Sequence, residues 1–156
     1  MPTPPCPHIT TTCLTVRPND LDADRHVNNA VYFEYLHQSR LEHLIRLGMY
    51  QPRGPRSANI FALAENTCRY LAPSYYGDIL YIWTATHAVG CSSFQLVYRV
   101  WRESDGVLIA AAHSVQVWLD EENRPMPLPA AVRQTFITSL CPDVPKMPSR
   151  TSIPSL

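Results

Sequence analysis

The sequence predicts one α+β domain in which a curved antiparallel sheet of about five strands wraps around one long central helix. Three features predict it: a Thr- and Val-rich stretch near the N-terminus, a long stretch without Pro or Gly, and four β-rich stretches with short connections. A chain of 156 residues suits a single domain with its own hydrophobic core. The five glycines all lie between these stretches, where they mark the ends of elements.

The first two elements are a strand and the central helix. Thr and Val dominate residues 9–17, which are expected to form the strand. Residues 29–47 are expected to form the helix, with Asn28 as its N-cap and Gly48 just beyond its C-terminal end. Apolar side chains surround most of this helix and leave one polar line, formed by Glu34, Gln38, Glu42 and Arg46. Such a pattern indicates a buried helix.

The rest of the domain is expected to be mostly β-structure. Four strands rich in β-branched and aromatic residues are expected at residues 60–71, 79–89, 93–103 and 107–120. The connections are short, which favours antiparallel hairpins over crossovers, at residues 73–78, 90–92 and 104–106. Prolines interrupt the pattern at residues 125–129, and residues 130–138 are expected to form a short helix.

The ends and the charge of the chain limit its partners. The Pro-rich residues 1–8 and 141–156 are expected to be a disordered N-terminal tail and a flexible C-terminal tail around a domain at residues 9–140. A formal net charge of zero gives no long-range attraction to nucleic acid or to an anionic membrane. The sequence also shows no signal-peptide pattern and no apolar run of membrane-spanning length, so the expected location is cytoplasmic.

Metal and cofactor chemistry is not expected. The five cysteines are odd in number and have no C-x-x-C spacing, which favours reduced thiols over a zinc site or disulfides. The histidines have no usual ligand spacing, and the sequence contains neither a G-x-S-x-G motif nor a Gly-rich phosphate loop. Twelve arginines stand against one lysine, a bias that fits either genome composition or planar, bidentate phosphate binding.

The densest polar segment, residues 19–29 (NDLDADRHVNN), lies between the first strand and the helix. Composition alone suits a solvated loop that ends in a helix cap. The position of this segment directly before a helix suggests a catalytic role instead, because a helix N-terminus offers free N–H groups and the positive end of the helix dipole. An acyl carbonyl placed there would be polarised, and a carboxylate a few residues upstream could activate water or attack the carbonyl itself. Spacing alone does not show that these groups meet.

Three motifs in the same order resemble those of hotdog-fold thioesterases, in the branch of 4-hydroxybenzoyl-CoA thioesterase and the bacterial long-chain acyl-CoA thioesterases. The first motif is residues 22–32 (DADRHVNNAVY), followed on the helix by Arg40. The second is residues 70–78 (YLAPSYYGD), and the third is residues 120–129 (DEENRPMPLP). The resemblance covers about residues 10–137.

The resemblance implies a hotdog fold, a homodimer or a tetramer of dimers, and catalysis without a metal or an organic cofactor. It places the catalytic carboxylate on Asp22 and the amide that polarises the thioester near Asn28 or Asn29. His26 and Asn28 match the H-V-N-N part of the motif, where His26 either orients Asp22, contacts the substrate or bonds to the backbone. Arg25 stands where many members have Gly or Gln, so it either stiffens the loop or carries a charge toward the substrate.

Other candidate residues have structural alternatives. Tyr32 and Phe33 could bind the substrate by lining an acyl pocket, or they could fill the core. Glu65 and Asn66, on the first strand after the helix, could belong to a substrate site shared between subunits. Arg40 matches the helix arginine of the family and is interpreted as structural rather than catalytic, since a buried Arg needs hydrogen-bond acceptors.

The sequence leaves three functions open. The first is hydrolysis of an acyl-CoA thioester to free acid and CoA, and the second is release of an acyl or polyketide chain from an acyl carrier protein by the same chemistry. The third is binding of acyl chains or thioesters without hydrolysis, which Asp22 argues against. Two chains are expected to associate because a sheet around a single helix leaves an open edge; a monomer with that edge capped by residues 125–140 is the alternative.

Overall fold

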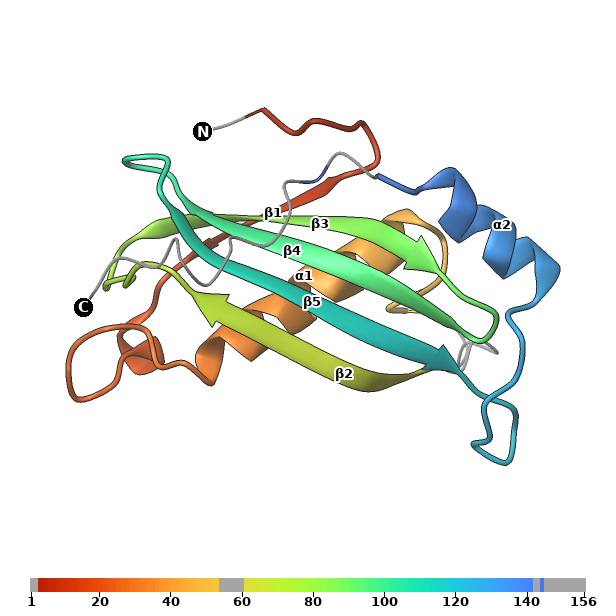
Figure 1. Ribbon diagram of the computed structural model, residues 1–156. Coiled ribbons are helices and arrows are strands. Elements are labelled where there is room, and N and C mark those ends of the chain that lie inside the picture. Colours follow the sequence, from red (N-terminus) through yellow and green to blue (C-terminus); the bar gives the residue numbers. More distant parts are fainter. Residues whose placement is uncertain (1–2, 54–60, 142–143, 145–156) are drawn as a thin grey trace.

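The computed structural model describes residues 3–53, 61–141 and 144, and it confirms the α+β architecture (Figure 1). Its elements, in chain order, are β1 (Thr10–Thr15), the 3₁₀ helix η1 (Pro18–Asp20), α1 (Val31–Arg46), β2 (Phe61–Tyr70), β3 (Ile79–Val89), β4 (Ser93–Arg102), β5 (Leu108–Trp118) and α2 (Ala130–Thr138). All the expected strands and both expected helices are present. Residue 60, the expected start of β2, lies outside the described residues, as do residues 1–2 and most of the expected C-terminal tail.

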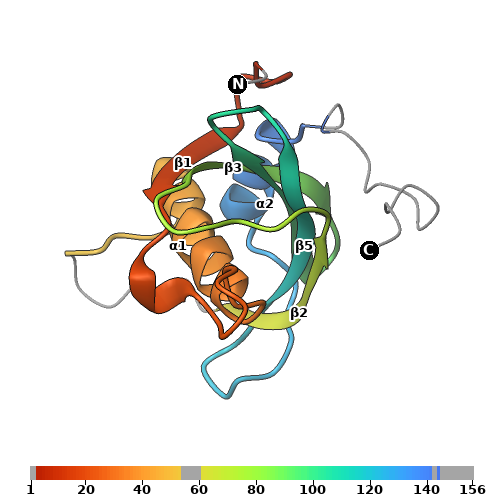
Figure 2. The ribbon, with the colours of Figure 1, turned by 90° about the vertical axis from the view of Figure 1, so that its left-hand side faces the viewer.

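The five strands form one antiparallel sheet in the order β1-β3-β4-β5-β2, and the sheet curls around α1 (Figure 2). The expected β3–β4 and β4–β5 hairpins are confirmed. The hairpin expected at residues 73–78 is wrong, because β2 pairs with β5 whereas β3 pairs with β1 and β4. The connection crosses the end of the sheet instead, where the N–H groups of Leu71 and Ala72 both donate to the carbonyl of Ile109 in β5 (2.8 and 3.2 Å).

The concave face of the sheet and α1 enclose the main hydrophobic core. Leu36 and Leu44 of α1 are fully buried in it. Alternate side chains of each strand face α1, as Phe94, Leu96 and Tyr98 of β4 illustrate. Full burial of one large apolar side chain contributes about 1.5–3 kcal/mol to folding. The central helix is therefore held by the sheet around it, in agreement with its apolar pattern.

A smaller hydrophobic cluster covers part of the outer face of the sheet. The ring of Trp83 in β3 packs on that of Trp101 in β4, with 5.4 Å between the ring centroids. Val97 and Cys141 are buried in the same cluster. The N–H of Cys141 donates to the carbonyl of Thr86 (3.0 Å), so the chain after α2 returns to the sheet.

The two ends of α1 differ in how well the sequence predicts them. Gly48 lies just beyond the helix with φ +74°, a backbone conformation that suits glycine. The prediction of Asn28 as the N-cap is wrong, because Ala30 precedes the first helical residue. Asn28 closes a turn ahead of the helix instead: its Oδ1 accepts the N–H of Ala30 and its carbonyl accepts the N–H of Val31 (both 2.9 Å).

His43 is a fully buried histidine of α1 that lies between two strands. Its Nδ1 is 2.8 Å from Oγ1 of Thr10 in β1, and its Nε2 is 3.2 Å from Oγ1 of Thr86 in β3. Burial, aided by the positive charge of Arg46, lowers the pKa of His43 to about 4. The imidazole is therefore neutral in the folded protein at neutral pH.

Acidification is expected to destabilise the protein through His43. Its pKa is about 4 in the folded chain and 6.5 in the absence of the fold. The neutral histidine thus favours folding fully above pH 6.5, and this contribution of about 3 kcal/mol is lost as the pH falls toward 4. Urea unfolding between pH 7 and 4 measures the effect. The His43→Gln variant should show a shallower pH dependence, whereas replacing the exposed His87 with Gln should leave the slope unchanged.

Candidate functional site

The polar segment between β1 and α1 folds as a small hairpin. Leu21 and Val27 form an antiparallel bridge. Inside this bridge, the N–H of Asp22 donates to the carbonyl of His26 (2.8 Å). The segment whose composition suits a solvated loop therefore has a defined backbone, and we call residues 20–28 the acidic hairpin.

Asp22 closes the tip of the acidic hairpin with one of its two carboxylate oxygens. Its Oδ1 accepts the N–H groups of Asp24 (2.9 Å) and His26 (3.3 Å). Its Oδ2 makes no hydrogen bond to any residue that the structure describes, and the side chain is exposed. Arg25, also exposed, has φ +66°, a conformation that glycine adopts more easily. A carboxylate oxygen is thus presented to solvent from a fixed backbone.

Asn29 supplies a free backbone donor at the start of α1. The N–H of Asn28 is used, since it donates to the carbonyl of Asp20 (2.8 Å). The N–H of Asn29 has no acceptor within residues 3–53 and 61–141. The carbonyl of Asn28, which belongs to the same peptide unit as this N–H, accepts the N–H of Val31 (2.9 Å), and the carbonyl of Asn29 accepts the hydroxyl of Tyr70 (2.8 Å), so both peptide units around Asn29 are held. Of the two expected amides, the one of Asn29 is therefore available to polarise a ligand, at the positive end of the helix dipole.

Asp20 anchors the base of the acidic hairpin. Its buried carboxylate accepts the hydroxyl of Tyr35 (2.7 Å) and the backbone N–H of Arg17 (2.8 Å), and it pairs with the Arg17 guanidinium. Burial opposes ionisation, but the hydrogen bonds from Arg17 and Tyr35 outweigh it and lower the pKa of Asp20. The anchoring role of Asp20 was not predicted from the sequence, because nothing in a cluster of three aspartates shows which carboxylate is buried.

The 73–78 turn supports the acidic hairpin from the other side. The carbonyl of Ser74 accepts the N–H of Val27 (2.9 Å), and the hydroxyl of Tyr32 donates to the Ser74 hydroxyl (3.2 Å). The half-buried ring of His26 meets the ring of Tyr75 edge to face, with 5.3 Å between centroids. Tyr32 is buried in the main core, while Phe33 is half-buried at its border.

Glu65 and Asn66 fall on opposite faces of the sheet. A β-bulge between Leu63 and Glu65 breaks the alternation of side chains along β2. Beyond the bulge the side chains alternate as usual, and Glu65 lies on the outer face, where it pairs with Nε2 of His113 (2.7 Å). Asn66 lies opposite Ser114 on the face toward α1, and its buried Oδ1 has no partner in the part of the chain described. Only Asn66 shares a face with α1.

A groove runs beside the first turn of α1. It has a volume of about 590 Å³ and is lined by Arg17, Pro18, Asn19, Asp20, Val31 and Glu34. This volume lies in the range of small-ligand sites. Within the described ranges, no group of three His, Cys, Asp or Glu side chains could hold a metal ion. Among the described residues, no helix has both the length and the apolar character needed to cross a membrane.

Comparisons with known proteins agree with this architecture. Residues 16–136 match the family model of the thioesterase-like superfamily. The chain is 29% identical over 130 residues to the acyl-acyl carrier protein thioesterase ATL3, chloroplastic, of Arabidopsis thaliana, covering 83% of this chain and 68% of that protein. It is 30% identical over 123 residues to ATL2 of the same plant, also named an acyl-acyl carrier protein thioesterase, and spans 65% of its length.

Solved structures of thioesterases have the same fold. A thioesterase from Thermus thermophilus, crystallised with coenzyme A and zinc, is 32% identical and has a TM-score of 0.70, with 81% of this chain and 95% of that chain covered. A gentisyl-coenzyme A thioesterase is 25% identical, with a TM-score of 0.72 and coverage of 81% and 99%. The chain therefore belongs to the thioesterase-like superfamily and is a thioester hydrolase with the hotdog fold.

Proposed function

We propose that the protein hydrolyses an acyl-CoA thioester to free acid and CoA, with Asp22 as general base or nucleophile. The observation that carries this proposal is the free Oδ2 of Asp22 on a rigid hairpin that leads directly into α1. The free N–H of Asn29 at the start of α1 is the proposed donor to the thioester carbonyl. Both groups are on short, hydrogen-bonded stretches, which suits preorganised catalysis.

The reaction needs these two groups in different ways. As general base, Asp22 takes a proton from the attacking water while a C–O bond forms; as nucleophile, its carboxylate forms the C–O bond itself and water then hydrolyses the anhydride. In both cases the carbonyl oxygen gains negative charge, which the N–H of Asn29 and the dipole of α1 stabilise. The tetrahedral intermediate then collapses: the C–S bond breaks, and the thiolate of CoA leaves and takes up a proton. This step gives the free acid directly when water attacks, and it gives the anhydride, which water hydrolyses afterwards, when the carboxylate of Asp22 attacks.

The other candidate residues support these two groups in the proposed mechanism. His26 holds the hairpin through its backbone and its contact with Tyr75, while Asn28 holds the turn before α1. The acyl chain is proposed to lie between α1 and β2, where the buried Oδ1 of Asn66 faces α1, with Phe33 as a half-buried residue at the border of the core. Tyr32, buried at the same border, shapes this space from the core.

Release of an acyl chain from a carrier protein is the second candidate function. The names of the two plant relatives favour it, since both are acyl-acyl carrier protein thioesterases. The site chemistry is the same for both substrates, because each presents an acyl group on pantetheine. The parts that differ are the nucleotide phosphates of CoA and the protein surface of the carrier.

Matched thioesters should separate the two functions. With the same acyl group, kcat/KM is expected to be higher on CoA than on the carrier protein, because the exposed Arg25 at the hairpin tip can meet the phosphates of CoA. Arg25→Asn, which tolerates the positive φ, should lower kcat/KM on acyl-CoA but not on acyl-pantetheine. A higher kcat/KM on the carrier protein would assign the second function instead.

A further inference from the structure

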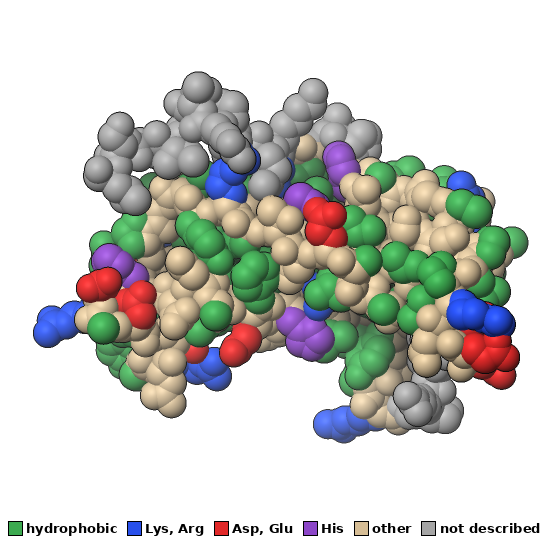
Figure 3. All heavy atoms as spheres, turned by 60° about the horizontal axis from the view of Figure 1, so that its bottom comes forward, with side chains coloured by type: hydrophobic (Ala, Val, Ile, Leu, Met, Phe, Trp, Pro, Cys, Tyr) green, Lys and Arg blue, Asp and Glu red, His purple; other side chains and the backbone are tan. Residues whose placement is uncertain are grey.

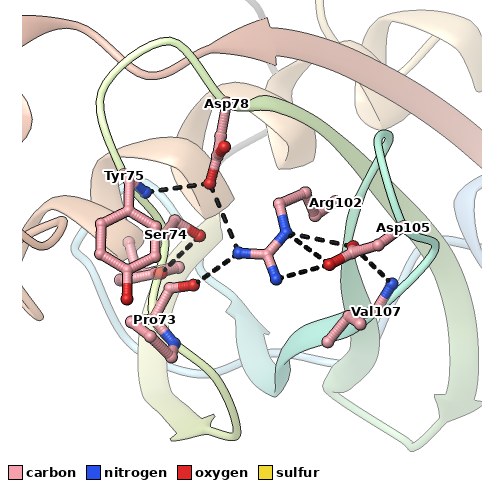
Figure 4. Close-up of polar contacts among 8 residues, drawn as sticks. Pro73, Ser74, Tyr75, Asp78, Arg102, Asp105 and Val107 are labelled. Carbon is pink, nitrogen blue, oxygen red and sulfur yellow. Dashed lines mark hydrogen bonds and ion pairs between the residues drawn. The ribbon is translucent and has the colours of Figure 1, made fainter.

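Arg102, the last residue of β4, joins the 73–78 turn to the β4–β5 hairpin (Figure 4). Its Nη1 donates to the carbonyl of Pro73 (3.0 Å) and lies 3.5 Å from Oδ2 of Asp78. Its Nε and Nη2 donate to the carboxylate of Asp105 (3.1 and 2.7 Å). One planar guanidinium thus holds two groups of the 73–78 turn and one group of the β4–β5 hairpin.

The partners of Arg102 are themselves fixed. The N–H of Tyr75 donates to Oδ2 of Asp78 (2.9 Å), and the N–H of Val107 donates to Oδ1 of Asp105 (3.1 Å). The side chain of Arg102 is only 16% exposed, unlike that of an ordinary surface ion pair. Its hydrogen bonds to Asp105 raise the pKa of Arg102, which keeps the guanidinium charged.

The turn held by Arg102 contacts both halves of the proposed site. Ser74, next to Pro73, accepts the N–H of Val27 in the acidic hairpin and the hydroxyl of Tyr32 in the first turns of α1. Tyr75 contacts the ring of His26. A shift of the turn would therefore move the acidic hairpin relative to the start of α1.

We propose that Arg102 is a positioning residue for hydrolysis: it holds the 73–78 turn so that Asp22 and the N–H of Asn29 keep their relative positions. This inference rests on the proposed roles of Asp22 and Asn29. The hydrogen bonds and ion pairs of Arg102 go to Pro73, Asp78 and Asp105 and not to the acidic hairpin, so Arg102 is proposed to act through Ser74 and Tyr75. Because a misplacement of about 1 Å can lower a rate about 10²-fold, the effect is expected on kcat more than on KM.

The test compares Arg102→Ala with a matched control, Arg124→Ala. Arg124 also forms an ion pair with an aspartate, Asp120, but it lies in the β5–α2 connection away from the turn. Folded Arg102→Ala is expected to lose about 10- to 100-fold in kcat with little change in KM, while Arg124→Ala keeps wild-type kinetics. Methylguanidinium at low concentration should restore part of the kcat of Arg102→Ala and should not affect Asp22→Asn.

Two further variants keep the test decisive. If Arg102→Ala fails to fold, Asp105→Asn weakens the same clamp and should give a smaller loss in kcat. In the Asp22→Asn background, Arg102→Ala should cost nothing more, because both act on one step. A folded Arg102 variant with wild-type kcat, or a further loss in the Asp22→Asn background, would overturn the inference. An active Asp22→Asn would instead overturn the proposed function, so the two failures are distinguishable.

Discussion

The Asp22→Asn variant is expected to fold normally and to hydrolyse its thioester at least ~10²-fold more slowly than the wild type. Asparagine keeps an oxygen at the Oδ1 position, so the N–H groups of Asp24 and His26 keep their acceptor. What is lost is the negative charge that takes a proton or attacks the carbonyl. Release of free thiol measures kcat, and thermal unfolding followed by circular dichroism shows whether the fold is retained.

Asp24→Asn is the matched control for this variant. Asp24 is an exposed aspartate two residues further along the same hairpin, and its carboxylate makes no hydrogen bond to the described residues. Its replacement removes the same charge from almost the same place and should leave kcat near the wild-type value. Near-wild-type activity in Asp22→Asn would show that the carboxylate is assigned to the wrong residue. Equal losses in both variants would indicate a general effect of charge.

The second large effect is expected from the open edge of the sheet. β2 is the last strand in the sheet order, and within the described part of the chain it pairs on one side only, with β5. Ala62, Leu63 and Ala64 are exposed there, and Leu63 has 46% of its surface accessible. Figure 3 shows this side of the molecule, where hydrophobic side chains lie across the middle. An open apolar edge of this kind favours pairing with a second copy about a twofold axis.

Residues 125–140, the alternative cover for the open edge of β2, contact a different part of the sheet. Phe136 of α2 stacks on Phe94 of β4, with 4.0 Å between ring centroids, and the N–H of Leu128 donates to the carbonyl of Cys91 (2.9 Å). These contacts hold residues 128–140 against the β3–β4 end of the sheet, and the N–H of Met126 donates to the carbonyl of Trp118 in β5 (3.0 Å), so the described segment does not pair with β2. We therefore propose that a second copy of the chain covers β2.

Sedimentation equilibrium is expected to give at least twice the mass of one 17.7 kDa chain at micromolar concentration. Leu63→Lys places a charge on the β2 edge and should shift the protein to monomer, with a loss of activity of more than ~10-fold if the site needs both subunits. Ile137→Lys, which changes an equally exposed residue on α2, should affect neither property. A wild-type monomer would refute the assembly, and an active Leu63→Lys monomer would refute a shared site.

The sequence predicts the elements of the fold well because their signals are local. The span of α1 follows from a stretch without Pro or Gly that ends at Gly48, and the two tight hairpins follow from short connections. The partner of β2 is not a local property, so the short connection at residues 73–78 wrongly predicts a hairpin. Its true course is decided by pairing with β5, far along the chain.

The candidate site is harder to predict because its geometry depends on contacts between distant residues. The motif resemblance identifies the hairpin residues, but the choice between the amides of Asn28 and Asn29 depends on the bond from Asn28 to Asp20. Glu65 and Asn66 are neighbours in a strand and so face opposite sides of the sheet, but which of them faces α1 depends on the register with β5 beyond a β-bulge, which a sequence pattern does not reveal. Arg102 gives no sign of its role until the turn and the β4–β5 hairpin are brought together.

The central claim is that Asp22 and the N–H of Asn29 act on one thioester. The most direct measurement is a crystal structure of Asp22→Asn with an uncleaved acyl-CoA bound. The proposal predicts the thioester oxygen about 2.7–3.1 Å from the Asn29 nitrogen. It also predicts the carbonyl carbon about 3–3.5 Å from the side chain of residue 22 or from a water bound to it. A thioester bound away from both groups would contradict the proposed mechanism.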